Sequence, residues 1–198
     1  MISREQNPHD RSGTAAEHRN EGWPQRLERA RQERNHRELA RLLLDGADAA
    51  MAEADTETDE EALERAQWLL ARTQRSLDAC GAHPECLALL CDLMERQSRL
   101  SQCWERLGHA GQRHTTRERV RDLAFEVAGR ATRTDDLGLR VSSTLRAAEV
   151  LDTLGDLVDA HALRARAFYK LGAAGLGEPP SDLGAPASSS RCAARSYQ

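Results

Sequence analysis

A dense group of chemically reactive side chains lies in the stretch CGAHPECLALLC, residues 80–91. Cysteine and histidine are the usual ligands of structural zinc, and Cys80, His83 and Cys86 have spacings that could suit it. A strong zinc signature needs a second short-spaced pair, however, and none is present. A helix would also turn Cys86 and Cys91 about 140° away from each other. We therefore predict that this stretch holds no metal; redox sensing by Cys80 is the remaining chemical alternative.

The spacing of the surrounding apolar residues predicts that these cysteines are core residues of two helices. Steps of three and four residues alternate on either side of the stretch, which is the heptad pattern of packed helices. The first seam is Leu63, Ala66, Leu70, Thr73, Leu77 and Cys80, and the second is Cys86, Leu90, Leu93, Gln97, Leu100, Trp104 and Leu107. Gly81 and Pro84 are suited to end one helix and begin the next. We expect an antiparallel helical hairpin in which Cys80, Cys86 and Trp104 are packed in the core.

No residue pattern typical of an active site occurs in the sequence. The phosphate-binding, dinucleotide-binding, zinc-protease and serine-hydrolase motifs are all missing. His109 and His114 flank a predicted turn, but no serine, cysteine or carboxylate lies at a spacing that would force a catalytic pairing with them. We therefore predict no catalytic, cofactor-binding or metal-binding residues, no cofactor, and a protein that is not an enzyme.

The composition restricts the classes of partner. The net charge is −4, from 28 basic and 32 acidic residues, so strong attraction to nucleic acid or to an anionic membrane is not expected. Lys170 is the only lysine, and the other basic residues are arginines. No apolar run reaches the ~18 residues that a membrane span needs, and no signal peptide is recognisable. The five cysteines do not resemble a secreted disulfide framework. These features predict a cytoplasmic protein with no membrane partner.

The chain divides into three predicted regions: a disordered segment 1–22, a single helical domain 23–171, and a flexible tail 172–198 rich in Gly, Ala, Pro and Ser. Helices are expected near 24–54, 58–80 and 84–107, and then from residues 115, 135 and 156 onward. Capping boxes at Thr58–Glu61 and Thr115–Glu118 would open two of them. Gly46 is expected to weaken or bend the first.

Residues 145–172, LRAAEVLDTLGDLVDAHALRARAFYKLG, resemble one tetratricopeptide helix–turn–helix unit. The leucine–glycine pairs at 137–138, 154–155 and 171–172 are 17 residues apart, and two such steps equal the 34-residue unit of that family. The resemblance places a turn at Gly155–Asp156 and small residues at Ala148, Ala160 and Ala167. Thr144 and Arg164 depart from the aromatic residues that the family prefers, and no proline closes the unit. Membership would imply hairpins that bind peptides or partner helices in a concave groove.

The expected fold is thus all-α, with about six helices in antiparallel hairpins that form an irregular bundle or a short tetratricopeptide-like solenoid. The expected function is a non-catalytic protein–protein interaction module, an adaptor or chaperone-like scaffold, whose partner is another protein or a second copy. A DNA-associated regulatory protein and a small helical ligand-binding protein or enzyme are the alternatives.

The candidate partner interface lies in the charged first half of the first helix. Trp23 and Leu27 stand there without an obvious seam to join. Together with Arg31 and Arg34 they would suit an interface core with a charged rim. Two interpretations compete: the helix projects and docks a partner, or it folds back so that Trp23 caps the bundle. We predict the first.

Overall fold

The computed structural model describes residues 22–57, 59–80 and 83–175. Within these ranges the chain forms seven α-helices and no strand, so the predicted all-α class is confirmed. The helices are α2 (Trp23–Gln32), α3 (His36–Glu57), α4 (Glu60–Cys80), α5 (Pro84–Arg106), α6 (Ala110–Ala131), α7 (Leu137–Thr153) and α8 (Leu157–Gly175). The predicted disordered segment, except residue 22, and the tail beyond residue 175 lie outside the described residues. None of the described helices combines the length and apolarity that a membrane crossing requires.

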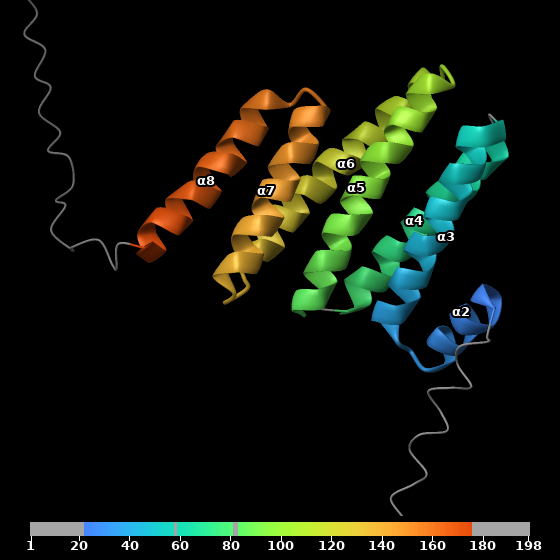
Figure 1. Cartoon of the computed structure of the whole chain (residues 1–198), viewed down its shortest axis with the longest axis horizontal. Helices are drawn as coiled ribbons and strands as arrows, with labels where there is room; N and C mark the ends of the chain where they lie inside the picture. Colours follow the sequence, from blue (N-terminus) through green and yellow to red (C-terminus); the bar gives the residue numbers. More distant parts are fainter. Residues whose placement is uncertain (1–21, 58, 81–82, 176–198) are drawn as a thin grey trace, which may run out of the picture.

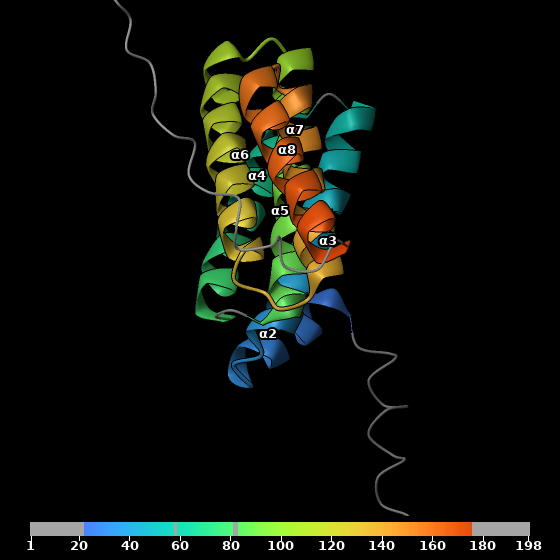
Figure 2. The same ribbon diagram turned by 90° about the vertical axis from the view of Figure 1, so that its left-hand side faces the viewer.

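Six of the helices pair into three hairpins that stand side by side: α3 with α4, α5 with α6, and α7 with α8 (Figure 1). The first helices of neighbouring hairpins also touch, α3 against α5 and α5 against α7. The predicted contact between α4 and α5 is present, but α4 packs more extensively on α3, and α5 on α6. The row has α8 at one end and α2 near the other, and Figure 2 views it from the α8 end.

Helix α5 is the centre of the core because it contacts α3, α4, α6 and α7. Its buried residues lie around more than half of the helix: Cys86, Leu87, Leu89, Leu90, Cys91, Leu93, Met94, Gln97, Ser98, Leu100, Ser101, Cys103 and Trp104. Two predictions are confirmed here, since Cys86 is buried and Trp104 has no exposed surface. Cys91 and Cys103 are buried although they lie off the predicted seam, because α5 has neighbours on more than one side.

Two of the tight turns between helices have the same geometry. Gly108 and Gly155 have φ angles of +78° and +83°, in the left-handed region that favours glycine. At each turn the N–H group of the next residue donates to the carbonyl five positions earlier, at 3.0 and 2.9 Å respectively. This is the Schellman arrangement, which ends a helix and satisfies its last carbonyls. The second of these turns joins α7 to α8 at the residues where the resemblance places a turn.

The predicted first helix, near 24–54, is in fact two helices, α2 and α3. Arg34 between them adopts a φ of 53°, and the Asn35 N–H donates to the Ala30 carbonyl at 2.9 Å, so this turn has the same pattern without a glycine. Asn35 then begins α3, because its Oδ1 accepts from the Glu38 N–H at 3.2 Å. The N-x-x-E spacing of this cap was the available sequence signal for the break.

The two predicted capping boxes have different outcomes. Thr115 does not begin a helix: α6 begins at Ala110, directly after the Gly108 turn, and Thr115 is exposed within it, donating to the Gly111 carbonyl at 3.1 Å. The prediction was wrong because a single left-handed glycine reverses the chain without a longer loop. Thr58 lies outside the described residues. Next to it, Asp59 Oδ1 accepts from the Glu61 N–H at 2.9 Å and supplies a cap for α4.

Candidate protein-binding face

The candidate site is the layer formed by the first helices of the hairpins, α3, α5 and α7, which lie next to one another (Figure 1). We call its surface the α3/α5/α7 face. Arginines and carboxylates from neighbouring helices meet across this face, so its chemistry is set by pairs of residues that are distant in the sequence.

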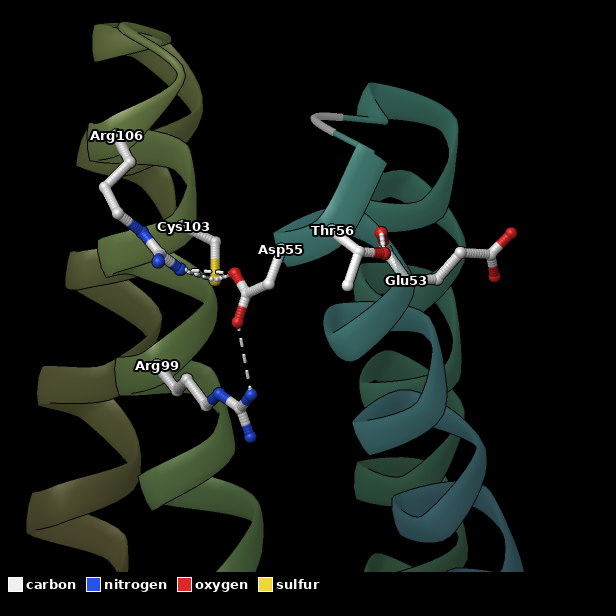
Figure 3. Close-up of polar contacts among 6 residues, drawn as sticks. All are labelled: Glu53, Asp55, Thr56, Arg99, Cys103 and Arg106. Carbon is white, nitrogen blue, oxygen red and sulfur yellow. Dashed lines mark hydrogen bonds and ion pairs between the residues drawn. The ribbon is translucent and has the colours of Figure 1, made fainter.

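Between α3 and α5 the central residue is Asp55, near the C-terminal end of α3 (Figure 3). Its Oδ1 accepts from Arg106 at 2.5 Å, and its Oδ2 accepts from Arg99 at 3.4 Å. The thiol of Cys103 lies between the two arginines on α5 and also donates to Oδ1, at 3.7 Å. Arg106 in turn donates to the Cys103 sulfur at 3.0 Å. One carboxylate of α3 is therefore held by three side chains of α5.

The electrostatics of this cluster suit a structural link better than a reaction. Burial acts to raise the pKa of Asp55, but the charges of Arg106 and Arg99 and their hydrogen bonds outweigh it and lower the pKa below its usual value. Burial raises the pKa of Cys103, although the hydrogen bond from Arg106 acts in the opposite direction. A reactive cysteine needs a lowered thiol pKa, so Cys103 lacks the property of a nucleophile.

Between α5 and α7 the linking residue is Arg146. Its Nε donates to Glu95 at 2.6 Å and its Nη2 donates to Asp92 at 2.7 Å. The hydrogen bond to Glu95 raises the pKa of Arg146, against the effect of burial, so the guanidinium keeps its charge. Beside it lies a groove of about 280 Å³. The residues lining this groove are Glu95, Ser98, Arg99, Gln102, Arg146, Glu149, Val150 and Thr153.

The same kind of link recurs elsewhere in the row of hairpins. Pairs of arginine and aspartate join helices of adjacent hairpins at Arg96–Asp48 (2.8 Å), Arg130–Asp78 (3.2 Å) and Arg121–Asp159 (2.8 Å). The last two join second helices of the hairpins, α4 to α6 and α6 to α8. Exposed ion pairs contribute only about 0–1 kcal/mol each. Their consistent position indicates that they set the alignment of one hairpin on the next.

The cysteine-rich stretch at 80–91 has a structural role in the described residues. Cys86 is buried and Cys80 is half-buried against the same core, as predicted. Burial, together with a hydrogen bond to Cys86, raises the pKa of Cys80 to about 11, which argues against redox sensing at neutral pH. His83 caps α5, its Nδ1 accepting from the Glu85 N–H at 3.3 Å. Within the described ranges, no three His, Cys, Asp or Glu side chains are grouped so that they could hold a metal ion.

The four residues predicted as a partner interface lie on α2 and the turn after it, and α2 folds back against α3. Trp23 is 38% exposed, and its indole N–H donates to the Leu42 carbonyl at 2.8 Å. Leu27 and Arg31 are half-buried, with Leu27 packed against the core, while Arg34 is exposed. Trp23 therefore covers its own α3, as the competing interpretation requires. A partner-binding role for these four residues stays a prediction.

Comparison of the sequence with protein-family models and with curated proteins found no match. Sequence reasoning also missed the α3/α5/α7 face, because Asp55 and Arg106 are 51 residues apart and Asp92 and Arg146 are 54 apart. The available signal was the near-exclusive use of arginine, whose planar fork suits carboxylates.

Proposed function

We propose that the protein is a non-catalytic protein–protein interaction module, an adaptor or chaperone-like scaffold, that holds a segment of another protein in the groove between α5 and α7. The observation that carries this proposal is the groove itself, which two adjacent hairpins line with side chains of both charges. Its volume of about 280 Å³ is just below the ~300–1,000 Å³ of small-molecule pockets. Such a groove suits a few side chains of a bound segment.

The lining defines the chemistry of the segment. Arg99 and Arg146 offer planar donors that fit carboxylates, and both side chains retain exposed surface, at 47% and 33%. Glu95 and Glu149 would accept from a basic residue, and Val150 supplies a small apolar contact. We expect a segment that carries an acidic and a basic residue close together. The resemblance of residues 145–172 to a tetratricopeptide unit is part of the same proposal, since membership would imply binding of peptides or partner helices in a concave groove.

Two observations favour this function over an enzyme or a DNA-associated regulator. The pKa values of Cys80, Cys91 and Cys103 are raised, which is opposite to the shift that a catalytic thiol needs. The arginines of the face are matched by nearby carboxylates, whereas a nucleic-acid surface carries an excess of positive charge.

The test begins with the full chain purified from its native cell under mild conditions, with identification of any co-purifying protein. That protein is then titrated against two matched variants, Gln102→Trp and Gln112→Trp. Both glutamines are exposed, but only Gln102 lines the groove, and Gln112 lies near the start of α6. We expect Gln102→Trp to weaken binding by about tenfold or more and Gln112→Trp to leave it unchanged.

Circular dichroism should show that both variants keep the helical content of the wild type. Binding that neither substitution changes, or that both weaken equally, would show that the groove is not the binding site.

A further inference from the structure

The outer surface of α8 carries large apolar side chains that no other helix covers. Val158 is 83% exposed, Tyr169 71%, Phe168 60% and Leu157 54%. Ala162 and Ala165 are exposed between them. Scattered apolar residues are normal on a protein surface, but several on one face of one helix indicate an interaction site.

Four of these residues form a single line, which we call the α8 stripe: Val158, Ala162, Ala165 and Tyr169. At about 100° per residue they fall within about 60° of one another around the helix axis. The buried residues of α8, Ala160, Leu163 and Ala167, lie on the opposite side. The helix is thus apolar on two faces, one packed on its own protein and one exposed.

The position of α8 makes this exposure more significant. It is the end helix of the row of hairpins, and Figure 2 looks directly at it. End helices of such arrays normally have a polar outer face, because no further repeat covers them. At the other end, α2 folds back on α3 and is polar, with three arginines, two glutamines and one glutamate among its ten residues. One end of the row is therefore covered by a polar helix, and the other presents the α8 stripe.

The spacing of the α8 stripe is self-complementary. Its steps of four, three and four residues are those of a coiled-coil seam. If a second α8 lies antiparallel, Val158 faces Tyr169 of the second copy and Ala162 faces Ala165 of the second copy. The two alanines at the centre allow close approach of the helix axes, and the large residues at both ends interlock. The stripe thus fits another copy of itself.

The charges beside the α8 stripe complement each other in the same antiparallel register. Asp159 and Arg166 occupy the flanking positions that face each other across an antiparallel seam. Asp159 of each copy would therefore lie opposite Arg166 of the other, and two-fold symmetry gives two such pairs. Arg121 contacts Asp159 through Oδ2, so this carboxylate would bridge two arginines.

We propose that α8 pairs antiparallel with α8 of a second copy, so that the α8 stripe is the interface of a two-fold symmetric dimer. The alternative of coverage by residues 176–198 of the same chain is disfavoured by composition. That segment contains only two leucines and one tyrosine among many Gly, Ala, Pro and Ser residues, so it lacks side chains to fill the stripe.

The first test is the mass of the full chain in solution, measured by sedimentation across a concentration series. We expect the wild type to reach the mass of two chains. Ala165→Glu places a charge at the centre of the α8 stripe, so this variant should have the mass of one chain. Trp68→Glu is the matched control, since Trp68 is 54% exposed on α4, in another hairpin, and lies outside the stripe. A monomeric wild type, or equal effects of the two substitutions, would overturn the proposal.

The second test fixes the register by disulfide crosslinking. Chains carrying Ala162→Cys and differently tagged chains carrying Ala165→Cys are mixed and oxidised mildly. The antiparallel register predicts crosslinks mainly between unlike chains, whereas a parallel pair would crosslink like chains and overturn the proposed register. Gln102→Trp should leave the mass unchanged, so failure of the groove and failure of the dimer can be told apart.

Discussion

Trp23 lies directly over Gly46, and the missing side chain of the glycine makes room for the indole ring. A Cβ atom at Gly46 would stand 2.8 Å from Cζ2 of Trp23, closer than van der Waals contact permits. The indole N–H, hydrogen-bonded to the Leu42 carbonyl at 2.8 Å, limits how far the ring can move. α3 continues through this position without a break. The absence of a side chain at Gly46 therefore lets α2 pack closely on α3.

Gly46→Ala should lower stability despite the better helix propensity of alanine. Inside an exposed helix this change would gain about 1 kcal/mol. Here the new methyl group displaces Trp23, so we expect a net loss of about 1 kcal/mol, the lower end of overpacking costs. Urea unfolding measures the stability, and a red shift of the tryptophan fluorescence would report the displaced ring.

The same substitution in a Trp23→Ala background is the control. With the ring removed, Gly46→Ala should stabilise the protein by about 1 kcal/mol, because only helix propensity remains. If the substitution has the same sign in both backgrounds, Trp23 does not sit on Gly46 in solution.

Replacing Arg34 by glycine and replacing Gly155 by alanine should change the stability of the protein in opposite directions. Both occupy the left-handed position of a Schellman turn, but a side chain there costs about 1–2 kcal/mol. Arg34→Gly should therefore stabilise the protein by about 1 kcal/mol, and Gly155→Ala should destabilise it by a similar amount. A Cβ at Gly155 would meet no atom within 4 Å, so backbone strain alone acts at that site. Thermal unfolding that moves both variants in one direction would contradict this account.

The strain at Arg34 also bears on the predicted partner interface. Backbone strain that a glycine would relieve is often kept where a side chain has a function. If Arg34→Gly raises stability but weakens partner binding, the interface prediction for Trp23, Leu27, Arg31 and Arg34 gains support. Unchanged binding would remove Arg34 from that interface.

Substitutions of Trp104 and Trp68 compare the stability contributed by a buried tryptophan with that contributed by an exposed one. Trp104 is completely buried and its indole nitrogen has no hydrogen-bond partner, so its contribution is packing. Trp104→Ala should cost about 3–5 kcal/mol. Trp68 is 54% exposed, with Arg72 4.7 Å from the centre of its ring, so Trp68→Ala should cost about 1 kcal/mol or less. Similar losses in urea unfolding would mean that Trp104 is not a core residue.

The sequence permits prediction of which face of each helix is buried, but not of which helix covers it. The heptad steps place Leu70 and Leu93 in the core, and both are fully buried. The same steps suggest that α4 and α5 are each other's main neighbours, yet α4 lies mainly on α3 and α5 on α6. The apolar periodicity of a helix predicts that one of its faces is buried. It does not specify the neighbouring helix, because the apolar face of any other helix could bury it.

The candidate site was less accessible to sequence reasoning than the fold. Mixed charges along a helix predict ion pairs within that helix, at spacings of three or four residues. Arg130 does pair with Glu126 in this way, but it also reaches Asp78 on another hairpin. Pairs of this second kind depend on how hairpins align, which no local pattern encodes.

The last prediction concerns the acid sensitivity of the Asp55 link. The pKa of Asp55 is lowered in the folded protein, so its ionised form stabilises the fold above the unfolded pKa of about 3.9. That contribution is lost as pH falls below about 4 and through the folded pKa, because the proton then competes with Arg99 and Arg106. Asp55→Asn should therefore melt at a lower temperature than the wild type at pH 7.

The difference between the two proteins should shrink as the pH is lowered below about 4, where the wild type also loses the charge. Asp45→Asn, an exposed position on the same helix, is the control for removing one negative charge from α3. Melting temperatures measured from pH 7 to pH 3 test this directly. If Asp55→Asn and Asp45→Asn shift the curve equally, general charge and not the contacts with α5 determines the effect, and the link between α3 and α5 through Asp55 adds no stability.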